Sequence, residues 1–106
     1  MASNGKTPGR SGLVLDPPAF APPLEMREAY LRRRRDELGE LRQGAGRGDW
    51  LLVRITANHV RGTGAMYGFP DIGSAADKLA DALQNEDSGC RDCLENYVRA
   101  VNESSL

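Results

Sequence analysis

One histidine is the residue best suited to chemistry in this chain of 106 residues. His59 is the only histidine, and it lies in the run from Ala57 to Pro70, close to Arg61 and Gly62. A neutral imidazole is a nucleophile that titrates near pH 7, and it can accept a phosphoryl group that is presented in line. Arginine binds the oxygens of such a group, and a glycine leaves room for a donor to approach closely. These residue types are compatible with phosphoryl transfer, but a lone histidine on a helix is usually a polar surface residue, so they do not establish it by themselves.

The segment Arg61–Phe69 resembles the active segment of histidine-containing phosphotransfer (HPt) domains. The family pattern is roughly His-x-Leu-Lys-Gly, followed by six small or apolar positions, the sixth of which is the glycine of a closing Gly-Phe. The chain fits this pattern from the basic residue onward. When the two are aligned without gaps on Gly62 and Gly68, the phosphorylated histidine of the family falls on Asn58, one place before His59.

The resemblance implies a phosphoryl carrier that is not itself a kinase. HPt domains pass a phosphoryl group between response-regulator receiver domains, so the expected partner is a receiver domain, a hybrid sensor kinase, or both. No cofactor is expected on this chain, because the receiver brings the magnesium ion. Arg61 stands where the family has lysine. We prefer His59 as the phosphoacceptor. One alternative is a degenerate module, with Asn58 at the acceptor position, that binds a receiver or kinase partner without being phosphorylated; another is a helical scaffold unrelated to signalling.

Apolar spacing predicts four helices, over residues 24–43, 50–67, 70–85 and 90–102. Short connections between amphipathic helices favour an all-α fold, an antiparallel four-helix bundle, over residues 23–106. Residues 1–22 are rich in Gly, Pro and Ser and are expected to form a mobile arm. The apolar residues of this arm, which allow part of it to lie on the bundle, are Leu13, Val14, Leu15 and Phe20.

The second predicted helix carries two apolar faces at 100° per residue. The inward face is formed by Val53, Ala57, Val60, Gly64 and Tyr67. The other face includes Leu51, Ile55, Gly62 and Met66, with Asn58 and His59 on its two sides. An apolar face outside the core needs a covering element or a partner. We therefore expect the partner-binding surface to consist of Leu51, Ile55, Asn58, Arg61, Gly62 and Met66 around His59.

Composition and charge exclude several other classes of function. Residues 1–61 carry eleven Lys or Arg and seven Asp or Glu, whereas residues 62–106 carry three and eight. This balance and the few aromatic residues argue against a nucleic-acid binder. The sequence has no apolar stretch of about 20 residues and no signal-peptide pattern, so a cytoplasmic, soluble monomer that does not enter a membrane is expected.

Three further patterns have simpler structural interpretations. The run Arg32–Arg35 spreads around a helix and is expected to form a solvated face. Cys90 and Cys93 continue an apolar stripe and are too few for a zinc site, so no metal is expected. The segment Gly62–Gly64 lacks the lysine and the preceding strand of a nucleotide loop, and small residues there can instead permit close helix packing.

Overall fold

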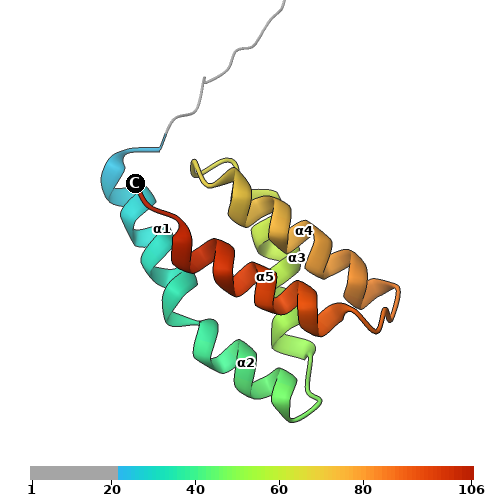
Figure 1. Ribbon diagram of the computed structural model, residues 1–106. Helices are drawn as coiled ribbons and strands as arrows, with labels where there is room; N and C mark the ends of the chain where they lie inside the picture. Colours follow the sequence, from blue (N-terminus) through green and yellow to red (C-terminus); the bar gives the residue numbers. More distant parts are fainter. Residues whose placement is uncertain (1–21) are drawn as a thin grey trace, which may run out of the picture.

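The computed structural model describes residues 22–106, which form helices joined by short loops (Figure 1). The helices of this part are α1 (Leu24–Asp36), α2 (Leu38–Gly46), α3 (Leu51–Thr63), α4 (Pro70–Gln84) and α5 (Cys90–Glu103). The described residues contain no strand, so the predicted all-α class is confirmed. None of these helices is long and apolar enough to span a membrane. The arm predicted for residues 1–22 lies outside the described residues, apart from Pro22.

The helix predicted over residues 24–43 is present but is interrupted at Glu37, which separates α1 from α2. The two helices lie nearly end to end, with a bend between them (Figure 1). Backbone hydrogen bonds continue across the bend, because Glu37 N donates to Arg33 O at 3.2 Å and Leu41 N donates to Glu37 O at 3.1 Å. Leu38 and Leu41 are buried, so the apolar register continues as well. A pattern of apolar residues therefore cannot reveal this interruption.

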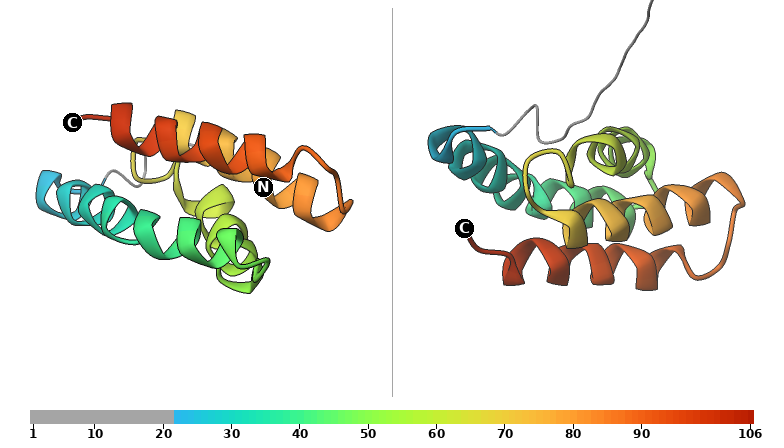
Figure 2. Two further views of the ribbon diagram at one scale, coloured as in Figure 1. Left: turned by 60° about the horizontal axis from the view of Figure 1, so that its bottom comes forward. Right: turned by 90° about the horizontal axis from the view of Figure 1, so that it is seen from above.

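α4 and α5 lie side by side and run in opposite directions, whereas α3 crosses behind them (Figures 1 and 2). In the right-hand view of Figure 2, α3 is seen nearly along its axis while α4 and α5 lie across the view. α3 packs mainly on α4, and α1 packs on α5 and α2. No Cα atom of α1 lies within 8 Å of a Cα atom of α3. The backbones of these two helices are therefore not in close contact.

α3 ends at Thr63, four residues before the predicted end at Tyr67. The chain then forms consecutive turns to Gly68, which has a φ of 91°. This backbone conformation is accessible to glycine without steric cost, so Gly68 allows the turn. Pro70 follows at the first position of α4, where its missing N–H costs nothing. Met66 consequently lies in the turn after α3 and not on the helix.

The core is formed by the inward faces of all the described helices. Val53, Ala57 and Val60 are almost completely buried, as predicted for the inward face of α3. The other two predicted members lie in the turn after the helix, where Gly64 is buried and Tyr67 is half-buried. Cys90 and Cys93 are half-buried against the core, as their place in an apolar stripe predicted. Burial raises the pKa of the Cys93 thiol, with neighbouring carboxylates acting in the same direction.

Candidate functional site

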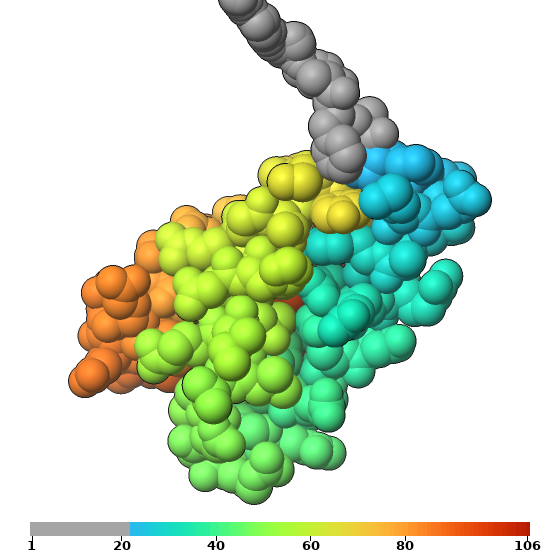
Figure 3. Space-filling model, turned by 180° about the vertical axis from the view of Figure 1, so that it is seen from behind, coloured from blue at the N-terminus to red at the C-terminus, as the bar shows by residue number. Residues whose placement is uncertain are grey.

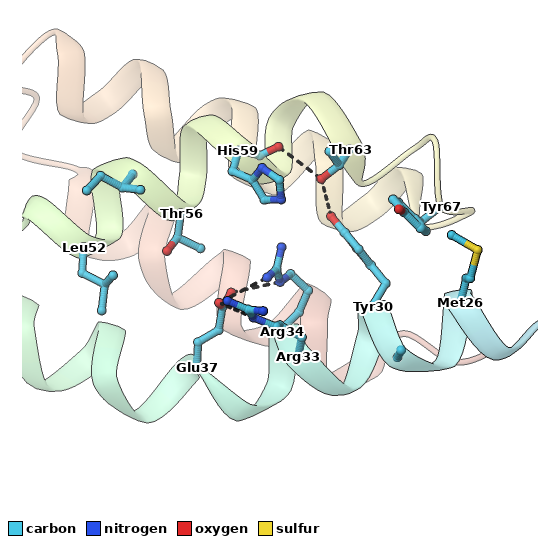
Figure 4. A pocket seen from close by; sticks show the side chains of 12 residues that line it. Met26, Tyr30, Arg33, Arg34, Glu37, Leu52, Thr56, His59, Thr63 and Tyr67 are labelled. Atoms are coloured by element: carbon cyan, nitrogen blue, oxygen red, sulfur yellow. Dashed lines mark hydrogen bonds and ion pairs between the residues drawn. The ribbon is translucent and has the colours of Figure 1, made fainter. Parts of the chain in front are cut away.

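His59 is exposed on α3, and its side chain lines a groove between α3 and α1. Figure 3 shows the hollow between these two helices on the back of the molecule. The groove has a volume of about 730 Å³, within the range of ligand-binding clefts. In Figure 4 the imidazole of His59 points across the groove toward Arg34 of α1. The residues that line the groove are Met26, Ala29, Tyr30, Arg33, Arg34, Glu37, Leu52, Ile55, Thr56, His59, Thr63 and Tyr67.

Arg34 and Glu37 form a largely buried ion pair at the floor of this groove. Arg34 is only 5% exposed, and its Nε lies 2.9 Å from Glu37 Oε1, while its Nη2 donates to Glu37 Oε2 at 3.2 Å. The guanidinium also lies 4.9 Å from the ring centre of Tyr30. Burial raises the pKa of the Glu37 carboxyl, although Arg34 and Arg33 oppose the shift. Arg34 Nη1 is buried and has no hydrogen-bond partner among the described residues.

A chain of two hydrogen bonds connects α1 to the turn of α3 that carries His59 (Figure 4). The Thr63 hydroxyl donates to His59 O at 3.1 Å, so the Tyr30 hydroxyl, 2.8 Å away, is the donor to Thr63 Oγ1. The Tyr30 ring also stacks on Tyr67, with ring centres 4.5 Å apart. These contacts close one end of the groove and hold the last turn of α3 in place.

Asn58 and Arg61 lie on the other side of α3, toward α4. Asn58 Nδ2 donates to Arg54 O at 3.1 Å, and Arg61 Nη1 lies 3.4 Å from Asn58 Oδ1. Arg61 Nη2 forms ion pairs with Asp77 at 2.7 Å and with Asp81 at 3.4 Å. Asn58 therefore lies on the side of the predicted apolar face that is nearer α4, and His59 lies on the side that is nearer α1. The structure does not bring Arg61 to His59. The guanidinium of Arg61 is instead paired with two carboxylates of α4.

The apolar residues predicted for the partner surface are exposed, with Leu51 and Ile55 on α3 and Met66 in the turn that follows it. Leu51 is 63% exposed, Ile55 57% and Met66 51%, and Leu52 beside them is 42% exposed. A Cβ built on Gly62 would meet no atom within 4 Å, so nothing in the described part of the molecule requires a glycine there. A glycine in a helix costs roughly 1 kcal/mol relative to alanine. The fold itself therefore does not explain why a glycine stands at this position.

Sequence reasoning missed Arg33, Arg34 and Glu37, which provide the charge beside His59. Three members of the arginine run are exposed, as expected for a solvated face, but Arg34 is buried. Its position three residues after Leu31 and four before Leu38 places it on the buried stripe of α1. Helical spacing could therefore have identified Arg34, whereas the inward turn of Glu37 depends on the bend between α1 and α2.

In comparisons with known proteins, no family model, no curated protein and no solved structure matches this chain. Among residues 22–106, no three His, Cys, Asp or Glu side chains lie close enough together to hold a metal ion. Function is therefore inferred from the geometry around His59 and from the segment Arg61–Phe69.

Proposed function

We propose that this protein is an HPt-type histidine phosphotransfer module, in which α1 and α2 together make the first helix of a four-helix bundle. It carries a phosphoryl group on His59 between response-regulator receiver domains, or between a hybrid sensor kinase and a receiver. It acts as a cytoplasmic monomer and is a carrier without kinase activity of its own. It needs no cofactor, because the magnesium ion of the reaction is held by the receiver.

The observation that carries this proposal is the open approach to His59. The imidazole is exposed, Gly62 lies one turn away with free space above it, and Ile55 is exposed on the same helix. A receiver domain is larger than any pocket on this molecule, so a transfer site must be a surface that a second protein can cover. The exposed imidazole lies beside apolar side chains and beside a glycine that the fold does not require. This surface satisfies the requirement.

The chemistry requires a nucleophile and positive charge, and both lie at the groove. The unprotonated imidazole nitrogen of His59 attacks the phosphorus of the receiver's aspartyl phosphate. The P–N bond forms, the P–O bond to the aspartyl group breaks, and the carboxylate leaves with its electron pair. Arg33 lines the same groove with a side chain that is 77% exposed, which allows it to contact phosphoryl oxygens. Arg33 thus has the role of contacting the phosphoryl oxygens, which the sequence had suggested for Arg61.

A second candidate is a degenerate module that binds a receiver without accepting phosphate. It is favoured by one observation: Asn58, at the family's acceptor position, lies on the side of α3 that faces α4, away from the groove that His59 lines. An amide cannot form a phosphoramidate in the way that imidazole does. A receiver that docks on the α4 side would meet Asn58 first.

Phosphoryl transfer from an acetyl-phosphate-charged receiver, followed by mass spectrometry under conditions that preserve phosphohistidine, separates the two candidates. The proposal expects a gain of one phosphoryl group on wild type and none on His59→Ala. The matched control is the exchange Asn58→His with His59→Asn, which keeps the composition and moves the imidazole to the other side of α3.

Acceptance by the exchanged protein alone would establish the degenerate module. Acceptance by neither protein from several competent receivers would overturn the phosphorelay proposal. Thermal unfolding of each variant should remain within a few degrees of wild type, because both positions are exposed.

A further inference from the structure

The only two cysteines of the sequence, Cys90 and Cys93, lie in the first turn of α5, next to the loop that follows α4 (Figure 1). Residues three apart on a helix share a face, so the two side chains are neighbours, with Cβ atoms about 5–6 Å apart. Both are half-buried against the core, so each keeps part of its surface in solvent. Cys93 also lines a cleft of about 260 Å³ between α4 and α5, together with Lys78 of α4. A small reagent can therefore reach this pair of thiols.

The first turn of α5 is placed where a helix can adjust. A disulfide needs Cβ atoms about 3.5–4.5 Å apart, so the turn must tighten by roughly 1–2 Å to close one. The N–H of Cys90 bonds outside the helix, to Asp87 O at 3.2 Å, and the bond from Cys93 N to Gly89 O, at 3.0 Å, closes the first turn. Gly89 is the N-cap and provides no side-chain hydrogen bond to the helix. Few bonds therefore oppose a tighter turn.

Arg91, between the two cysteines, connects this turn to the segment between α2 and α3. Its Nη2 donates to Ala45 O at 3.2 Å, near the end of α2, and its Cζ lies 5.5 Å from the centre of the Trp50 ring. Trp50 directly precedes α3 and is the chain's only tryptophan. A turn that tightens around Arg91 shifts its guanidinium relative to both contacts. The state of the two thiols is therefore coupled to the segment that leads into α3.

We propose that Cys90 and Cys93 form a reversible thiol–disulfide site, which reacts with small disulfides such as glutathione disulfide and transmits its state to the α2–α3 connection through Arg91. The Cys90 thiolate attacks one sulfur of the small disulfide, whose S–S bond breaks, and one thiolate leaves with the electron pair and takes up a proton. Cys93 then loses its proton and attacks the Cys90 sulfur, which closes the intrachain disulfide and releases the second thiol. The two cysteines are oxidised by two electrons, and the small disulfide is reduced to two thiols.

The order of the two attacks follows from the surroundings of Cys93, which lies deeper along α5, in the cleft against α4. Burial raises the pKa of the Cys93 thiol, and the carboxylates of Asp87 and Asp92 act in the same direction. Because the thiolate is the nucleophile, Cys93 reacts slowly with a disulfide from solution. Once Cys90 carries a mixed disulfide, Cys93 attacks it within one turn of the same helix, where proximity compensates for the small fraction of thiolate.

The test treats the reduced full chain with glutathione disulfide and follows its mass, with alkylation of the remaining thiols. Wild type should lose both free thiols and two hydrogen atoms without a lasting adduct, and dithiothreitol should restore both thiols. Cys93→Ser should instead keep one glutathione on Cys90. Cys90→Ser should react at least about tenfold more slowly than Cys93→Ser, because Cys93 supplies less thiolate. A lasting adduct on wild type, or a disulfide between two chains, would overturn the proposed site.

Trp50 fluorescence measures the coupling to the α2–α3 connection in fully reduced and fully oxidised samples. Oxidation should change the emission of wild type, and the change should be at least about threefold smaller in Arg91→Gln, which lacks the cation over the ring. The matched control is Arg99→Gln, the same substitution about two turns further along α5, which should respond as wild type does. An equal change in Arg91→Gln and wild type would overturn the coupling. Neither experiment involves a receiver, so their outcomes are independent of phosphoryl acceptance by His59.

Discussion

Gly64 and Gly73 are in backbone contact where the end of α3 meets the start of α4. A Cβ built on Gly64 would lie 2.6 Å from Gly73 N and 2.7 Å from Gly73 Cα, closer than side-chain carbons come to backbone atoms. Gly62, two residues earlier, would meet nothing within 4 Å. Two glycines of one short motif therefore serve different purposes: Gly64 allows two helices to pack, and Gly62 leaves open a surface.

This contrast predicts opposite effects on stability for the same substitution. Gly64→Ala should lower the free energy of unfolding by about 2–3 kcal/mol, because the backbone of α4 must move to admit the methyl group. Gly62→Ala should raise it by roughly 0.5–1 kcal/mol through helix propensity. Urea unfolding of both variants measures the difference. Equal losses would show that the space above Gly62 is filled in solution.

Partner binding should depend on Ile55 while folding should not. Ile55 is 57% exposed, so Ile55→Asp should change the free energy of unfolding by less than about 1 kcal/mol while it abolishes binding to a receiver in titration calorimetry. The control is Val53→Asp, which places a charge at a fully buried position and should unfold the protein. A large loss of stability in Ile55→Asp would place Ile55 in the core.

Tyr97 carries a buried hydroxyl that has no hydrogen-bond partner in the described part of the chain. Tyr97→Phe should therefore leave stability at pH 7 unchanged or increase it by up to about 1 kcal/mol. Burial raises the pKa of Tyr97, and the charge of Glu37 adds to the shift. The unfolded chain then releases this proton near its ordinary value of 10.0 while the folded chain keeps it. Wild type should lose stability relative to Tyr97→Phe as the pH rises above 10.

Denaturant unfolding of wild type and Tyr97→Phe at pH 7 and pH 11 checks this expectation. A pH-independent difference between the two proteins would contradict it, and would indicate that the hydroxyl ionises as readily in the fold as in the unfolded chain.

Arg61 is expected to act through its ion pairs with α4 and not through His59. Arg61→Gln should cost up to about 1 kcal/mol at low salt, and the cost should shrink in 1 M NaCl because the pairs are partly exposed. Asp77→Asn should show a similar salt dependence. If Arg61→Gln instead abolishes phosphoryl acceptance by His59 without changing stability, Arg61 reaches the phosphoryl group as the family resemblance implies.

Much of the fold was accessible from the sequence, because the helices have strong local signals. The bounds of α4 and α5 follow from Pro70, from the stripe that includes Leu79, and from the loop before Cys90. The early end of α3 could not be predicted from the sequence, because Gly62 and Gly64 look alike there and only their packing distinguishes them. The groove depends on a bend at Glu37 and on the crossing of α3, which local spacing does not determine.

The contacts of α1 with its neighbours affect the order in which the helices unfold locally. α1 packs on α5 and α2 but has no close backbone contact with α3, to which it is joined by the hydrogen bond from Tyr30 to Thr63. Elements with few buried contacts open at lower free energy than the rest of a domain. α1 should thus behave as a separate cooperative unit, whose amide hydrogens exchange before those of α4 and α5. A protein that captures this partly open state would gain access to His59 from the side of α1.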